Sequence, residues 1–169
     1  MIYEFVKQMQ KELGQLNKWL DTATSHATDK KFDVNVLVTS RLAPDQFPLS
    51  RQIQSTCDTV KFALARVGGK EMPQIPDEEK TIADLKARVS KTIALVDGVS
   101  AKDFEGAADR VVVNPRWEGK VMNAKDYFLE HVTPNFYFHL AHTYAILRHN
   151  GVNIGKKDYL GQLSLKDPK

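Results

Sequence analysis

Apolar residues that recur every three or four positions along four long segments constrain the fold more than any other feature of this chain. Residues at that spacing lie on one face of an α-helix. The segments span residues 2–24, 48–67, 81–96 and 123–149. In the first segment the apolar face consists of Phe5, Met9, Leu13, Leu16 and Leu20. Four helices that each need to bury one face predict an all-α fold, a four-helix bundle.

Local signals mark where these helices begin. Pro48 suits the first position of the second helix, because its missing N–H is not needed there. Thr81, followed three residues later by Asp84, is typical of the capped start of a helix. Asn123 stands in the same relation to Asp126 and predicts the start of the last helix. The caps therefore agree with the periodicity.

The segment before the last helix breaks the helical rhythm. RVVVN and KVMN flank the turn sequence PRWEG, which predicts a small two-stranded hairpin. Earlier in the chain, a polar connection over residues 24–33 leads to one or two helical turns at 34–38, with Asp33 as their cap. The tail, about residues 152–169, has no clear period. We expect residues 1–169 to form a single helical-bundle domain with a β-hairpin inserted before the fourth helix.

Composition excludes several classes of protein. The 169 residues contain 24 lysines and arginines against 21 aspartates and glutamates, a net charge of +3, which is too even to indicate nucleic acid or an anionic membrane as a partner. No apolar run approaches the roughly 18–20 residues of a membrane-spanning helix. The first residues do not resemble a signal peptide, and the single cysteine, Cys57, excludes an internal disulfide. We therefore expect a soluble cytoplasmic protein.

The last helix carries a polar line on its predicted buried face. Asn135, His139 and His142 share one stripe, with apolar residues at both of its ends. Pro134 removes a backbone donor just upstream and predicts a kink. If the stripe faces the bundle interior, its polar groups must be satisfied by protein partners, water or a ligand.

Two interpretations of this polar line stay open. Two histidines one turn apart can share a metal ion such as zinc or nickel, with a third ligand from elsewhere in the bundle. The candidates for that ligand are His26, Asp45, Gln54, Cys57 and Asp58. In the other interpretation the histidines are structural and form hydrogen bonds with side chains such as Asn135 or Asp58.

Other residues carry weaker signals. Cys57 lies on an apolar stripe, which predicts a buried, unreactive thiol. Trp117, in the hairpin turn, is expected at an exposed tip as a dimer contact or the lid of a pocket, and the dimer contact is favoured. His131 has the position of a surface or edge histidine. The absence of a phosphate loop and of GxSxG, HExxH and CxxC motifs sets aside phosphate-loop and serine-hydrolase functions.

Two blocks of the sequence resemble a known family. LAPDQFPLSRQIQ at 42–54 and PNFYFHLAHTYAILRHNGVNIGKKDYLG at 134–161 are similar to the bacterial family DUF1993, a branch of the DinB/YfiT-like superfamily of four-helix bundles. The resemblance covers nearly the whole chain. It implies an up-down-down-up bundle, frequently a homodimer, with a pocket at one end of the helices. It also implies kinship with proteins that bind a divalent metal through three histidines, some of which are thiol-dependent transferases or isomerases.

The resemblance carries over only part of that metal site. When the shared LRHNG ending is aligned, His139 stands at the second histidine of the family's HxxxH pair and Asn135 at the first. The corresponding region of the second helix holds Gln54 and Ser55. An amide oxygen is a weak ligand for zinc, so the resemblance implies a degenerate metal site. His142 and His26 could rebuild the site in a shifted form.

Three functions follow as expectations. The first is a small-molecule pocket, whose candidate residues are Asn135, His139, His142, Gln54 and Asp58. The second is a transferase or hydrolase acting on a thiol-linked small molecule through zinc or nickel held by His139, His142 and His26. The third is a structural homodimer without catalysis. No nucleic-acid or membrane partner is expected.

Overall fold

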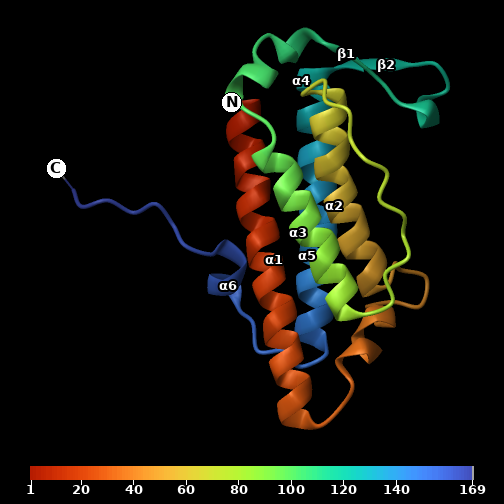
Figure 1. Cartoon of the computed structure of the whole chain (residues 1–169), viewed down its shortest axis with the longest axis vertical. Coiled ribbons are helices and arrows are strands. Elements are labelled where there is room, and N and C mark those ends of the chain that lie inside the picture. The colour runs from red at the N-terminus through yellow and green to blue at the C-terminus, as the bar shows by residue number, and fades with distance from the viewer. Residues whose placement is uncertain (169) are drawn as a thin grey trace.

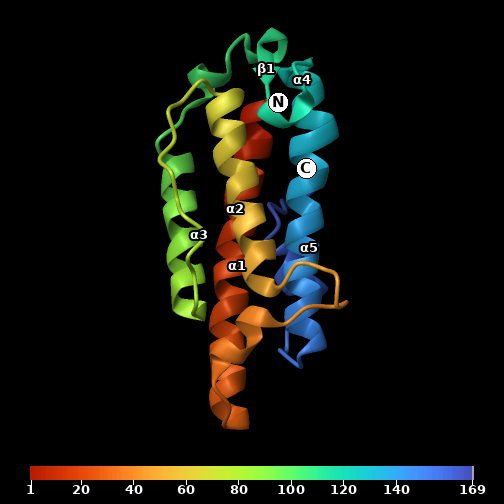
Figure 2. The ribbon, with the colours of Figure 1, turned by 90° about the vertical axis from the view of Figure 1, so that its right-hand side faces the viewer.

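Four long helices lie side by side in the computed structural model, which describes residues 1–168 (Figure 1). They are α1 (Ile2–Lys30), α2 (Leu49–Arg66), α3 (Ile82–Asp97) and α5 (Thr133–His149). α1 and α5 run in one direction and α2 and α3 in the other, which confirms the predicted bundle and its order. Because α2 and α3 are parallel, the connection over residues 67–81 returns along the whole bundle (Figure 2). α2 packs against both α3 and α5.

The first helix is longer than predicted. It continues to Lys30, because Ala23 and Ala27 extend its buried face by one more turn. Lys31 then ends it in the left-handed conformation, with φ of 60°. The expected end near residue 24 was therefore wrong, and His26 lies within α1 rather than in a loop. The short helix η1 (Val34–Thr39) follows, with Asp33 as the predicted cap.

The predicted helix starts are confirmed, and only the start of α2 differs, by one residue. Pro48 is the N-cap of α2 rather than its first helical residue. At the start of α3 the N–H of Asp84 donates to Oγ1 of Thr81 at 3.1 Å, and the Asp84 carboxylate accepts from the Thr81 N–H. These two bonds satisfy donors that a helix start leaves free.

A buried arginine fastens the long connection between α2 and α3. The side chain of Arg88 is only 1% exposed and forms ion pairs with Asp58, Asp77 and Glu79 at 2.8–2.9 Å. It also donates to the carbonyl of Pro76 at 3.2 Å. Three of these four partners belong to the connection or its end, so α3, α2 and the connection meet at one guanidinium group.

The predicted hairpin lies across one end of the bundle (Figure 1). It follows the short helices η2 (Ala101–Phe104) and η3 (Ala107–Asp109). Strands β1 (Val111–Val113) and β2 (Val121–Asn123) pair in antiparallel register, with Val112 opposite Met122. The turn between them contains the helical turn η4 (Pro115–Trp117). The hairpin thus places its turn residues beside the start of the last helix.

The last helix has three parts rather than one. It starts with α4 (Ala124–Asp126), capped by Asn123 as predicted, and continues through the π-helical segment η5 (Tyr127–Val132) into α5. Pro134 cannot donate to the carbonyl of Glu130, so a regular α-helical bond is missing at this point. Just upstream of Pro134, where the sequence predicted a kink, the helix has a widened π-helical turn.

The tail contains a helix that the sequence pattern did not reveal. The helix α6 (Lys156–Leu160) packs against α1, where the rings of Tyr159 and Trp19 stack with centroids 5.5 Å apart. Within residues 1–168, no helix has both the length and the apolar character needed to cross a membrane. Cys57 is buried, and its burial raises the pKa of the thiol to about 12, in agreement with the prediction of an unreactive side chain.

Candidate functional site

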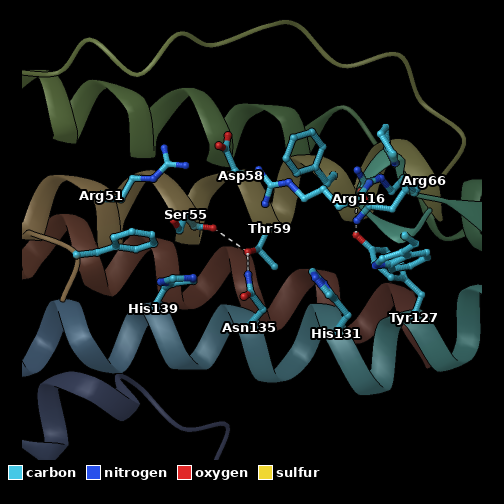
Figure 3. A pocket seen from close by; sticks show the side chains of 15 residues that line it. Arg51, Ser55, Asp58, Thr59, Arg66, Arg116, Tyr127, His131, Asn135 and His139 are labelled. Atoms are coloured by element: carbon cyan, nitrogen blue, oxygen red, sulfur yellow. Dashed lines mark hydrogen bonds between the residues drawn. The ribbon is translucent and has the colours of Figure 1, made fainter. Parts of the chain in front are cut away.

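A cleft of about 750 Å³ lies between α2, the last helix and the turn of the hairpin (Figure 3). One face of α2 contributes Arg51, Ser55, Asp58, Thr59, Phe62 and Arg66. These residues repeat every three or four positions, so they point to the same side of the helix. The last helix contributes Tyr127, His131, Asn135 and His139, each four residues after the one before. The hairpin closes one end with residues 114–117.

The π-helical segment explains why residues at a strict spacing of four line one wall. In a regular α-helix each step of four residues turns about 40° away from the starting direction. A π-helical turn contains more residues than an α-helical one. Tyr127 and His131 therefore stay on the cleft side together with Asn135 and His139.

Hydrogen bonds between α2 and α5 fix the centre of the cleft. Nδ2 of Asn135 donates to Oγ1 of Thr59 at 2.7 Å, and that hydroxyl donates to the carbonyl of Ser55 at 2.7 Å. Figure 3 shows this chain of polar groups across the cleft. The side chain of Asn135 is thereby held by the opposite helix and does not depend on a ligand for its orientation.

His139 is buried and held in one tautomer. Its Nδ1 lies 2.8 Å from Oε1 of Gln52, whose Nε2 donates to the carbonyl of Phe47 at 3.2 Å. Since Gln52 presents its oxygen, Nδ1 of His139 carries the proton and donates it. Burial, with His142 and Arg51 nearby, lowers the pKa of His139 to about 4. At neutral pH the ring is uncharged, and Nε2 is left as an acceptor or a base.

The hairpin end of the cleft combines a cation with aromatic rings. Nη1 of Arg66 donates to the Tyr127 hydroxyl at 2.9 Å, and its guanidinium lies 4.7 Å from the ring centre of Phe62. Trp117 packs edge-on against Tyr127 and His131, with ring centroids 5.7 and 6.4 Å apart. Burial, and then the charge of Arg66, lowers the pKa of His131. Nδ1 of His131 is buried and has no partner within residues 1–168.

The structure brings together some of the predicted site residues and separates others. Asn135, His139 and Asp58 line the cleft. Gln54 instead donates to Glu79 at 2.8 Å, on the side of α2 that faces the long connection. Nδ1 of His142 bonds to a carbonyl of its own helix, and the side chain does not line the cleft. Gln54 and His142 are therefore corrected as cleft residues, because the helix points them to other sides.

The three histidines predicted to hold a metal are not assembled. His26 lies near the end of α1 with its ring against Phe32, whereas His139 faces Gln52. In the part of the chain that the structure describes, no three side chains of His, Cys, Asp or Glu come close enough to hold a metal ion. The groups around His139 and Asn135 are amides and a hydroxyl, which are poor zinc ligands. These residues do not fit a zinc or nickel ion.

Several cleft residues were missed by the sequence interpretation. His131 was placed at the surface, although its spacing of four from Asn135 and eight from His139 was a usable signal. Trp117 was expected at an exposed tip, with a dimer contact favoured over a pocket lid; it is half-buried against Tyr127 and lines the cleft, a position that suits the less favoured of these two alternatives. No sequence signal linked Arg116 to this site, because the hairpin brings it there only in the folded chain.

Comparisons with known proteins agree with this architecture. Residues 2–160 match the family model described as Domain of unknown function (DUF1993). A DinB family member protein from Shewanella denitrificans, whose crystal structure was solved at 1.83 Å, is 44% identical and superposes with a TM-score of 0.96. The match covers 99% of this chain and 96% of that chain. A search of curated proteins found no match. The chain belongs to the DUF1993 family, within the DinB-like superfamily of helical bundles.

Proposed function

We propose that this protein binds a small organic molecule in the cleft between α2 and the last helix. The observation that carries the proposal is His139, a buried neutral histidine held by Gln52 with its Nε2 free in the wall of the cleft. A cavity of about 750 Å³ has the size of typical ligand pockets. Nε2 of His139 has no hydrogen-bond partner in the described chain, and a polar group of a ligand in the cleft could bond to it.

The proposal includes the loss of the three-histidine metal site that the superfamily resemblance implies. Two imidazoles, His131 and His139, line the cleft on either side of Asn135, and Asn135 bonds to Thr59 across it. A hydroxyl and an amide that satisfy each other leave no set of metal ligands. The cleft is therefore suited to hydrogen bonds with an organic ligand.

Ligand-observed NMR with a library of neutral, anionic and cationic small molecules tests the proposal. Ser55→Phe fills the cleft from α2, and Ser25→Phe places the same bulk on the exposed face of α1 as a matched control. We expect some molecules to bind the wild type and the Ser25→Phe variant, and to bind the Ser55→Phe variant about ten-fold more weakly. Equal binding to all three proteins would refute a ligand site in the cleft.

Metal analysis of untagged protein separates this proposal from its alternative. We expect less than a stoichiometric amount of zinc or nickel, in the wild type and in the His139→Ala variant alike. About one metal ion per chain, lost in that variant, would instead favour a metal-dependent transferase or hydrolase acting on a thiol-linked molecule. The homodimer stays a prediction, which light scattering of the purified protein tests.

A further inference from the structure

We propose that the hairpin end of the cleft binds an oxyanion, the phosphate or carboxylate group of the ligand, between Arg66 and Arg116. This inference rests on the proposed function and adds the chemical class of the ligand. The remaining part of the molecule would lie along α5 toward His139. Both arginines line the cleft, and Figure 3 shows Arg66 beside Tyr127.

The charges of the cleft do not cancel. Three arginines line it, and Asp58 is the single carboxylate among the lining residues. Asp58 is already paired with Arg88 and Lys61 at 2.9 Å each. Arg51 is paired with Asp77. Within residues 1–168 no carboxylate pairs with Arg66 or Arg116, so two positive charges at one end of the cleft lack a counter-charge from the described chain.

Arg66 is held in place but has donors to spare. A guanidinium group has five N–H donors, and one hydrogen bond from Arg66 goes to the Tyr127 hydroxyl. Its guanidinium carbon lies 4.7 Å from the ring centre of Phe62, which adds a cation–π contact. An arginine held by these two contacts, with several free donors, is suited to bidentate contacts with an oxyanion.

Arg116 reaches the same end from another element. It lies in the turn of the hairpin, where its backbone N–H donates to Oδ1 of Asn114 at 3.1 Å and fixes the local turn. Two arginines from different elements can contact different oxygens of one anion. The proposed site therefore needs both α2, which carries Arg66, and the hairpin, which carries Arg116.

The surroundings limit the size and shape of the ligand. Trp117, Tyr127 and Phe62 offer aromatic surfaces next to the arginines, which favours an oxyanion attached to a flat organic group. His131 adds an unpartnered, buried Nδ1. Eight residues separate His131 from His139, roughly 12 Å along a helix. A short anion therefore fills the hairpin end without reaching His139.

Calorimetric titration at low salt tests this site with inorganic phosphate, phenyl phosphate and benzoate. We expect Arg66→Gln and Arg116→Gln each to weaken binding by about ten-fold or more. Lys91→Gln removes one positive charge from the exposed surface of α3 and is the matched control. The unfolding midpoint of each variant is measured as a control, to check that the variant is folded.

The outcomes separate the sources of the oxyanion and the two proposals. Binding of both phosphates but not benzoate supports a phosphate ester as the ligand, and binding of benzoate as well supports carboxylates too. Equal weakening in Lys91→Gln and the arginine variants would overturn the inference, since net charge alone would then explain binding. If neutral molecules bind in the cleft but none of the three anions does, the oxyanion site is refuted and the ligand pocket stands. If nothing binds, both proposals fail.

Discussion

The two sides of α2 differ in how their arginines are paired. On the side of α3, Arg88 is almost fully buried and surrounded by the carboxylates of Asp58, Asp77 and Glu79. On the side of α5, Arg66 lines a cleft and meets the hydroxyl of Tyr127. Arg88 connects segments of the chain through ion pairs, whereas Arg66 lies at the open surface of the cleft.

The difference follows from the cost of removing charge from water. A buried guanidinium group is tolerated only when counter-charges and acceptors surround it, as they surround Arg88. An arginine on a water-filled cleft keeps its solvation and needs no protein counter-charge. Pairing with carboxylates therefore marks the structural arginine, and a guanidinium without a carboxylate partner beside a cavity marks the group available to a ligand. The four predictions below test this distinction.

Replacement of Arg88 should have the largest effect. Arg88→Met leaves three carboxylates without their common cation, and we expect the free energy of unfolding to fall by about 3–5 kcal/mol. Urea unfolding followed by circular dichroism measures this loss. Lys91→Met, on the exposed face of the same helix, should change it by less than about 0.5 kcal/mol. Similar small losses in both variants would remove the contrast between the two sides of α2.

Acid should destabilise the cleft through His139. Its pKa is lowered to about 4 in the folded state, so the folded protein binds this proton less readily than the unfolded chain, where the pKa is near 6.5. Stability is complete above pH 6.5 and is lost as the pH falls toward 4, by about 3 kcal/mol at most. His139→Asn, which can still donate to Gln52, should lose less stability than the wild type over this range. Urea unfolding at several pH values measures the difference, and an equal loss of stability in His139→Asn and the wild type would contradict this assignment.

Glu12 tests whether a buried charged group without a counter-charge reduces stability, in this case for a carboxylate in α1. Its side chain is buried in α1, Oε1 accepts from Gln8, and Oε2 has no partner within residues 1–168. Burial raises the pKa of this carboxyl, although Lys11 and Gln8 oppose the shift. Folding therefore favours the protonated form, and its contribution to stability declines as the pH rises through the raised pKa. We expect Glu12→Gln to raise the free energy of unfolding by about 1 kcal/mol near pH 8.

The matched control for Glu12 is Glu118→Gln at the exposed turn of the hairpin. It should change stability by less than about 0.5 kcal/mol. Urea unfolding of both variants at about pH 8 and about pH 5 checks the sign, since the gain from Glu12→Gln should shrink at the lower pH. A loss of stability in Glu12→Gln at both pH values would contradict the assignment.

Arg116 should show the smallest effect on stability. Arg116→Gln removes an exposed side chain without a paired carboxylate in the described chain, and we expect the unfolding free energy to change by less than about 0.5 kcal/mol. Thermal and urea unfolding measure it. The comparison would be sharpened if added phosphate raised the melting temperature of the wild type but not of this variant. A large loss of stability without ligand would place Arg116 in the same class as Arg88.

Most of the fold was predictable because its signals are local. The apolar stripes, the caps at Thr81 and Asn123 and the sequence of the hairpin each depend on residues a few positions apart. The helix α6 was not predictable, because it is short and is held by contacts of Tyr159 with Trp19, far away in the sequence. The extent of α1 was underestimated because alanine contributes little to an apolar pattern.

Only part of the site was predictable, because some of its residues meet through contacts between elements far apart in the sequence. Asn135 and His139 were identified because they interrupt an apolar stripe on a single helix. Gln52, the partner of His139, also lies on the buried stripe of α2, beside Ile53. Gln54 was chosen instead, although two residues along a helix turn it about 200° away. Arginines usually lie at the surface, so their meeting at the cleft could not be predicted before the elements were placed.

Because of the widened turn at Tyr127–Val132, adding or removing one residue there would change which side chains line the cleft. Deletion of one residue there would restore a regular helix and rotate everything before it by about 100° relative to Asn135 and His139. Tyr127 and the hairpin that carries Arg116 would then move away from the cleft together. A one-codon insertion or deletion is therefore an evolutionary step by which this bundle can exchange one end of its binding site while keeping the other.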